Sequence, residues 1–224
     1  MSRSAPLSRA LLALLSLLLL SGCAATKEAQ VRKLQARAAH ELGQSHLNDG
    51  RTALGLASLQ EAVTLDPEEP VFQQSLGLAY LNLKQLPQAL EALRNAIALD
   101  PSYALAHVHL GVALAESGRW EEAIQEYRRA LAFPGSITTV LAHHNLGWAY
   151  YNLGKLQEAE EEFNFVLRLE PTQASAHYYL GLVLREAGRR AEAREAFSRA
   201  QELEPESVFG RAAREHLKAL GERQ

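Results

Sequence analysis

The stretch that decides the fold is residues 70–103, PVFQQSLGLAYLNLKQLPQALEALRNAIALDPSY. It carries a Leu-Gly pair at Leu76-Gly77 and ends near an Asp-Pro pair, Asp100-Pro101. The Leu-Gly pair recurs along the chain at intervals of 34, 34, 36 and 34 residues, at Leu42-Gly43, Leu76-Gly77, Leu110-Gly111, Leu146-Gly147 and Leu180-Gly181. A fixed period of this length indicates an array of helical hairpins.

Three further positions keep the same register. A small residue recurs at Gly55, Ala89, Ala123, Ala159 and Ala193. A large one follows four residues later at Leu59, Leu93, Tyr127, Phe163 and Phe197, and prolines close four units at Pro67, Pro101, Pro171 and Pro205. We expect the glycine and the small residue to let two helices approach closely while the large side chain fills the space between them. The proline ends the second helix because it lacks an N–H and clashes with the preceding turn.

This pattern resembles the tetratricopeptide repeat. The resemblance implies an all-α fold, a right-handed superhelical array of helix-turn-helix repeats. Five units fit the spacing, at 36–69, 70–103, 104–137, 140–173 and 174–207. Residues 208–220 lack the Leu-Gly pair and carry Arg211, Arg214, Glu215 and Lys218, so we expect a C-terminal helix that gives the array a polar end.

The N-terminal residues have the pattern of a secretory signal. Arg3 and Arg9 precede an apolar run from Leu11 to Leu20, which is too short to cross a bilayer as a stable helix. We therefore expect residues 1–22 to be a signal peptide that is removed. The sequence Leu20-Ser21-Gly22-Cys23 resembles the bacterial lipobox, which implies cleavage before Cys23, a thioether-linked diacylglycerol on its sulfur and an acyl chain, such as palmitate, on its amine.

The residues after Cys23 bear on location. Position 24 is alanine and not the aspartate that favours inner-membrane retention in many such lipoproteins. The resemblance therefore implies a lipid anchor in the outer membrane, on its periplasmic face. Residues 23–35 are expected to form the lipidated cysteine and a tether, in which the polar stretch is either a short spacer helix or flexible. Cys23 is the only cysteine, so no intrachain disulfide can form.

Composition excludes several functions. Without residues 1–22 the chain has 21 basic and 26 acidic residues and no long basic run, which argues against a nucleic-acid partner. No phosphate-binding glycine loop, zinc-protease motif or nucleophile elbow is present, and we expect neither enzymatic activity nor a cofactor beyond the lipid. Because His107, His143 and His177 share the fourth repeat position, about 10 Å apart in stacked repeats, they favour packing over a shared metal site.

The first helix of each unit should line the concave side of a superhelix, and its residues not used in packing form the expected partner-binding groove. The predicted groove residues are Leu78, Leu81, Val108, Val112, His144, Trp148, Tyr151, Tyr178 and Leu182. The alternative for each is packing against the neighbouring repeat. If exposed, this apolar and aromatic strip suits an amphipathic helix or an apolar peptide, with Trp148 and Tyr151 as the main anchors.

One junction is irregular. Residues 132–138, AFPGSIT, add two residues between the third and fourth units, either as an ordinary long turn or as a family feature. A proline-bearing junction here, together with the lipobox, resembles the lipoprotein pilotins of type IV pilus assembly. That resemblance implies an adaptor that binds outer-membrane secretin subunits and promotes their localisation and multimerisation, and hence twitching or gliding motility. The alternative is a general envelope scaffold that recruits peptidoglycan enzymes or outer-membrane assembly factors.

Overall fold

The computed structural model describes residues 6–133 and 135–221, with side chains from Thr26 onward except that of Ser136. Every regular element in this part of the chain is a helix, and the predicted all-α class is confirmed. The chain divides after Leu76 into two compact units, which are described separately.

The first unit contains α1 (Pro6–Asn48), α2 (Thr52–Leu65) and the first half of α3 (Pro70–Asn82). Its core is formed by Ala36 and Ala39 of α1, Ala62 of α2 and Phe72 of α3. The sequence was compatible with either a spacer helix or a flexible tether at residues 24–35. In the structure these residues are helical and form part of α1. Across the described residues, no helix is both long and apolar enough to cross a bilayer.

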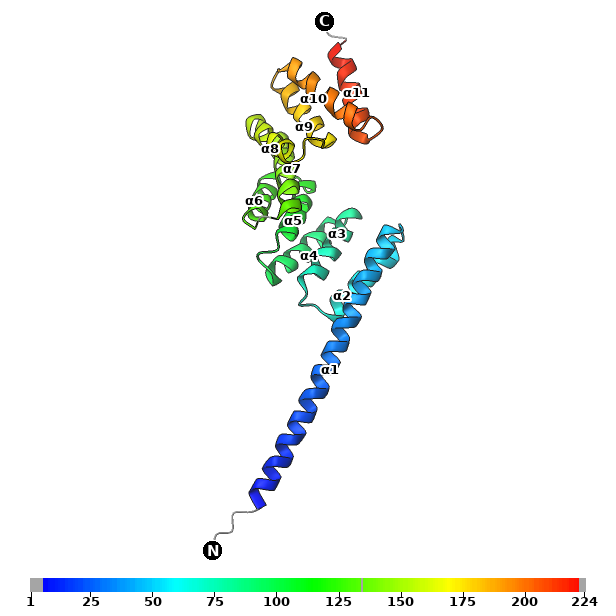
Figure 1. The fold of residues 1–224 in the computed structure, drawn as a ribbon, viewed down its shortest axis with the longest axis vertical. Helices are drawn as coiled ribbons and strands as arrows, with labels where there is room; N and C mark the ends of the chain where they lie inside the picture. The colour runs from blue at the N-terminus through cyan, green and yellow to red at the C-terminus, as the bar shows by residue number, and fades with distance from the viewer. Residues whose placement is uncertain (1–5, 134, 222–224) are drawn as a thin grey trace. The chain divides into compact units, whose positions relative to one another are not determined.

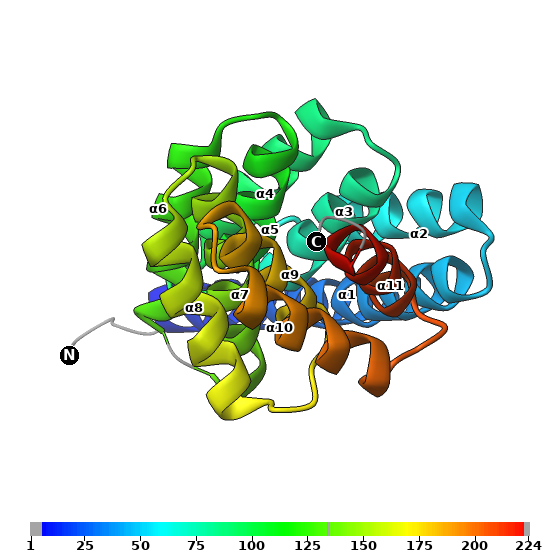
Figure 2. The same cartoon turned by 90° about the horizontal axis from the view of Figure 1, so that it is seen from above.

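The second unit contains the rest of α3 and eight further helices. They are α4 (Leu86–Leu99), α5 (Ala104–Glu116), α6 (Trp120–Leu131), α7 (Ser136–Asn152), α8 (Leu156–Leu169), α9 (Ala174–Glu186), α10 (Arg190–Leu203) and α11 (Val208–Gly221). Figure 1 shows that they follow one another as antiparallel pairs. In Figure 2, α5, α7 and α9 lie on the inner side of this unit and α6, α8 and α10 on its outer side.

The predicted close approach of the paired helices is confirmed. A Cβ atom added to Gly111 of α5 would lie 2.4 Å from Tyr127 Cε1 of α6. The same addition to Gly181 of α9 would lie 2.7 Å from Phe197 of α10. Tyr127 and Phe197 are fully buried, so each aromatic ring occupies the space that the missing side chain leaves.

The turns within the helix pairs need a left-handed backbone. Gly118, Gly154 and Gly188 adopt φ values of 75°, 71° and 77° there. Lys84 takes the same place between α3 and α4 with φ 59°, a conformation that is uncommon for a residue with a side chain.

The irregular junction lengthens a helix. α6 ends at Leu131 and α7 begins at Ser136, four residues before the expected start of the fourth unit at 140. Gly135 is extended, and its carbonyl oxygen accepts hydrogen bonds from the Thr139 N–H at 2.8 Å and the Thr138 hydroxyl at 3.0 Å. These bonds start the additional turn of α7, which leaves Ile137 75% exposed.

The end helix α11 has two different faces. Gly210, Ala213 and Leu220 are buried, while Arg211, Glu215 and Lys218 are exposed. The second unit therefore ends in a polar surface, as a stacked array requires.

Candidate partner-binding surface

The nine predicted groove residues lie on α3, α5, α7 and α9, all within the second unit. Six are half-buried: Leu78, Val112, His144, Trp148, Tyr151 and Tyr178. The prediction is wrong for the other three, because Leu81, Val108 and Leu182 are 5%, 1% and 7% exposed and cannot offer surface to a partner. Leu81 and Leu182 belong to the main core of the second unit, and Val108 packs with Ala130 of α6 and Ala142 of α7.

An aromatic strip remains on the inner side. We use this name for Trp148 and Tyr151 of α7 and Tyr178 and Tyr179 of α9. The Trp148 and Tyr151 rings stack with centroids 5.4 Å apart and an interplanar angle of 18°. Trp148 also lies 4.8 Å from Tyr179, and Tyr179 lies 5.3 Å from Tyr178. The four rings thus form one contact chain across two repeats, in which each ring is held in place by its neighbours.

The strip continues to α11, for which the sequence predicts only a polar end. Tyr178 contacts Phe209 at 5.7 Å and His216 at 5.9 Å between ring centroids. Tyr179 also contacts Phe209, at 5.6 Å. Tyr179 stands one residue after the predicted Tyr178, at a repeat position outside those predicted to line the groove. The apolar spacing of Phe209, Ala213, Leu217 and Leu220 indicates that Phe209 lies on the packed face of the end helix, and His216, seven residues after Phe209, lies on the same face.

The strip carries no charge at neutral pH. Burial raises the pKa of both Tyr178 and Tyr179, and Arg185 lowers that of Tyr178 to a smaller extent. Burial also lowers the pKa of His144, whose ring lies 5.4 Å from that of Tyr179. The buried Nε2 of His144 has no hydrogen-bond partner among the described residues. The arrangement therefore offers aromatic faces and neutral polar groups, which suits an apolar ligand.

A basic side chain, Arg185, lies at the end of the strip, where α9 contacts α11. Arg185 of α9 donates a hydrogen bond from Nη1 to His216 Nδ1 at 2.8 Å and pairs with Glu186. Desolvation and the positive charge of Arg185 lower the pKa of His216. This contact fixes α11 against the last repeat, so that the strip has a defined end.

The histidines at the fourth repeat position have structural contacts. His107 Nδ1 lies 2.7 Å from Glu126 Oε2, and its Nε2 lies 3.2 Å from the Pro101 carbonyl oxygen. His143 pairs in the same way with Glu162, and His177 Nε2 lies 2.9 Å from the Pro171 carbonyl oxygen. Each ring therefore ties its helix to the second helix of the same repeat or to the preceding turn. In the described part of the chain, no three metal-ligating side chains gather.

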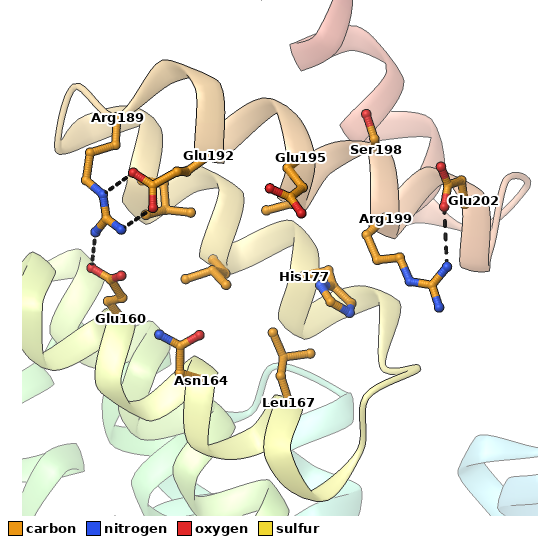
Figure 3. Close-up of a pocket in the computed structure, with 13 residues that line it drawn as sticks. Glu160, Asn164, Leu167, His177, Arg189, Glu192, Glu195, Ser198, Arg199 and Glu202 are labelled. Carbon is orange, nitrogen blue, oxygen red and sulfur yellow. Dashed lines mark hydrogen bonds and ion pairs between the residues drawn. The ribbon is translucent and has the colours of Figure 1, made fainter.

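A cavity of about 740 Å³ lies between α8, α9 and α10 (Figure 3). Its rim is charged, but most charges are paired with one another. Arg189 donates to Glu160 of α8 at 2.6 Å and to Glu192 of α10 at 2.7 Å, and Arg199 pairs with Glu202. The Arg189–Glu160 pair joins the fourth and fifth repeats, whereas the other two pairs lie within the fifth. Because most charged groups on its rim are engaged in these pairs, this cavity is a weaker candidate for partner binding than the aromatic strip.

Comparison with known proteins places these features in a family. Two family models, both described as tetratricopeptide repeat, match the chain, one over residues 36–69 and the other over 75–137 and 144–208. No curated protein sequence matches the chain.

Three solved structures have similar folds. PilW, described as a widely conserved type IV pilus biogenesis factor, superposes with a TM-score of 0.72 at 20% identity, over 84% of this chain and 94% of PilW. PilF of Pseudomonas aeruginosa gives 0.68 at 22% identity, over 86% and 95%. MamA gives 0.64 at 24% identity, over 76% and 92%. At these identities the likeness is one of fold.

Proposed function

Because the chain belongs to the tetratricopeptide repeat family, whose repeats serve protein interaction, we propose that it is an outer-membrane pilotin. In this proposal a lipid on Cys23 anchors the protein to the periplasmic face. The repeats bind secretin subunits and promote their localisation and multimerisation during type IV pilus biogenesis.

The observation that carries the proposal is the aromatic strip. Tryptophan and tyrosine dominate the binding energy of many protein interfaces, because their large rigid faces bury much area at little entropic cost. Trp148 and Tyr151 already stack on one another, so little ordering is needed when a ligand binds. Leu78 and Val112 are half-buried on the neighbouring inner helices and would extend the apolar contact.

The strip favours one kind of ligand. Its aromatic rings lie on two adjacent inner helices, and the charge described next to them, Arg185, is paired with Glu186. An amphipathic helix or apolar peptide of a secretin subunit can bury its apolar side there, with its polar side toward solvent. Binding of this kind would hold a subunit next to the membrane until it joins the multimer.

The fold similarity to PilF and PilW supports this assignment, since the match spans 95% and 94% of those proteins. The lipobox adds a separate argument from sequence. The side chain of Cys23 lies outside the described side chains, so its acylation rests on the Leu20-Ser21-Gly22-Cys23 motif. Three acyl chains would hold the protein on a bilayer permanently, because each buried methylene contributes about 0.8 kcal/mol.

The test is deletion of the gene, followed by gel electrophoresis of unheated outer-membrane fractions probed for the pilus secretin. We expect loss of the high-mass multimer, restored by the wild-type gene but not by Cys23→Ser. If the multimer and the pili persist in the deletion strain, the proposal is wrong. A change of cell shape or envelope integrity with normal pili would instead indicate a scaffold for peptidoglycan enzymes or outer-membrane assembly factors.

A further inference from the structure

The first repeat exposes an apolar stripe on α1. Val31, Leu34 and Leu42 are 49%, 60% and 51% exposed, and Ala38 between them is also exposed. Their separations of three and four residues place the four side chains on one face of the helix. Ala36, on the other face, is fully buried in the core of its own unit. We call Val31, Leu34, Ala38 and Leu42 the α1 stripe.

Later repeats bury the face that α1 exposes. Leu42 belongs to the first Leu-Gly pair, and the leucines of the other four pairs are 7%, 5%, 2% and 9% exposed, at Leu76, Leu110, Leu146 and Leu180. Ala142, the counterpart of Ala38 in the fourth repeat, packs with Val108 and Ala130 of the repeat before it. α1 continues as a single helix ahead of the first repeat, so no helical pair precedes that repeat in the described chain. The α1 stripe is therefore a helix-packing face that its own chain leaves open.

Two charges at the ends of the stripe have opposite signs. Lys27 lies two helical turns before Leu34 and Glu41 lies two turns after it, so both side chains lie close to the stripe. Both are exposed, and Glu61 of α2 lines a hollow beside the Glu41 end. The other carboxylate of this segment, Glu28, lies on the opposite edge of the stripe from Glu41. The stripe thus has a lysine near its first residue and carboxylates near its last.

This pattern is complementary to itself when a second copy runs in the opposite direction. A two-fold axis beside Leu34 places Leu34 against its counterpart and Lys27 of each copy against Glu41 of the other. Val31 of one copy then faces Ala38 of the other, which lines a hollow on α1. A second copy that ran in the same direction would instead bring lysine against lysine and glutamate against glutamate.

We propose that two copies of this protein pair through the α1 stripe, with their α1 helices antiparallel. The apolar side chains leave water, and Lys27 of each copy forms an ion pair with Glu41 of the other. Exposed ion pairs add little affinity, but like charges in contact are unfavourable, so the pairs set the direction of the two helices. Such pairing uses residues of the first unit only and is independent of what the aromatic strip binds.

The test is disulfide cross-linking of the full-length protein in its own membranes. The gene carries Leu34→Cys or, as a matched control, Arg32→Cys, and replaces the wild-type gene in a strain that lacks the pilus secretin. Arg32 is also exposed but lies on the opposite side of the helix from Leu34. The wild-type protein, whose only cysteine is Cys23, measures any background from that residue. Isolated membranes are oxidised, dimers are quantified on a nonreducing gel, and mass spectrometry identifies the linked residues.

We expect a dimer linked through position 34, with a much lower yield for the position 32 control and for the wild type. Lys27→Glu or Glu41→Lys, each added to Leu34→Cys, should lower the dimer yield by about threefold, because each substitution brings like charges together. The two substitutions combined should restore the yield, because they exchange the partners of both ion pairs.

Equal yields at positions 34 and 32 would overturn the inference. A yield that neither charge reversal lowers, or that the combined variant does not recover, would also overturn it. A disulfide from position 34 to a different protein would overturn it as well and assign the stripe to that protein. Secretin is absent from the strain, so the result is separate from the test of the pilotin function.

Discussion

Gly111 of α5 lies directly against Tyr127 of α6, so that a Cβ atom at position 111 would come within 2.4 Å of the tyrosine ring. Tyr127 is 2% exposed, and burial raises the pKa of its hydroxyl. The ring cannot move outward without opening the core of the repeat. The closeness of the two helices therefore depends on the absence of one methyl group.

The substitution Gly111→Ala should destabilise the protein by about 1–3 kcal/mol, since overpacking outweighs the gain in helix propensity. Chemical denaturation followed by circular dichroism measures the effect. Gly221→Ala is the control, because nothing lies within 4 Å of its added Cβ. Equal stability of the two variants would contradict the packing described here.

Gly210 should matter for one helix only. A Cβ atom there would lie 1.9 Å from the Glu204 carbonyl oxygen, a backbone atom that cannot move aside easily. Gly210→Ala should therefore detach α11 and expose the Phe197 ring, which stacks 4.8 Å from His216. Hydrogen exchange should increase in residues 208–221 and remain unchanged in α5 and α6. If residues 208–221 exchange as slowly in the variant as in the wild type, α11 tolerates the added side chain and the prediction is wrong.

The two His–Glu pairs provide a matched comparison. The side chains of His107 and Glu126 are 5% and 10% exposed, whereas those of His143 and Glu162 are 17% and 19% exposed. Glu126→Ala leaves a buried imidazole nitrogen without its partner and should cost about 1–3 kcal/mol. Glu162→Ala should cost less because water can replace the lost carboxylate. The order of the two unfolding free energies tests this, and the reverse order would contradict it.

Stability should decrease in acid because of His109. Burial lowers the pKa of His109 to about 4 in the folded protein, against an ordinary value of 6.5. Between these two pH values the unfolded chain binds a proton at His109 that the folded chain does not. The free energy of unfolding therefore keeps its full value above pH 6.5 and decreases as the pH falls toward 4. The loss is on the order of 3 kcal/mol.

His109→Gln removes this linkage. The variant should lose less stability than the wild type between pH 7 and pH 4.5 in parallel urea titrations. The pKa values of His40, His144 and His216 are lowered by burial in the same direction, so some acid sensitivity should remain. An unchanged dependence on pH would rule out His109 as a contributor.

Much of the fold could be predicted because the repeat period fixes which residues meet. Gly111 and Tyr127, sixteen residues apart, recur as Gly147 with Phe163 and Gly181 with Phe197, and each pair is in contact. A local pattern of this kind needs no knowledge of distant parts of the chain. The additional turn of α7 could not be predicted, because it depends on the extended backbone of Gly135.

The surface was harder to predict than the core. Leu81, Val108 and Leu182 occupy positions that face inward in the repeat pattern, yet neighbouring repeats cover them. Trp148 and Tyr178 remain half-buried. The repeat pattern gives the direction of a side chain, but its exposure depends on how closely the next helix approaches at that point.

The measurement that tests the central claim most directly is complementation of the deletion strain with Trp148→Ala and Tyr151→Ala together. Leu169→Ala is the matched control, since Leu169 is 52% exposed but lies on the outer helix α8, outside the aromatic strip. Circular dichroism and immunoblotting establish that both variants fold and accumulate. The account predicts that the strip variant fails to restore the secretin multimer in unheated outer-membrane fractions, whereas the control restores it. A multimer of wild-type intensity with the strip variant would contradict the account.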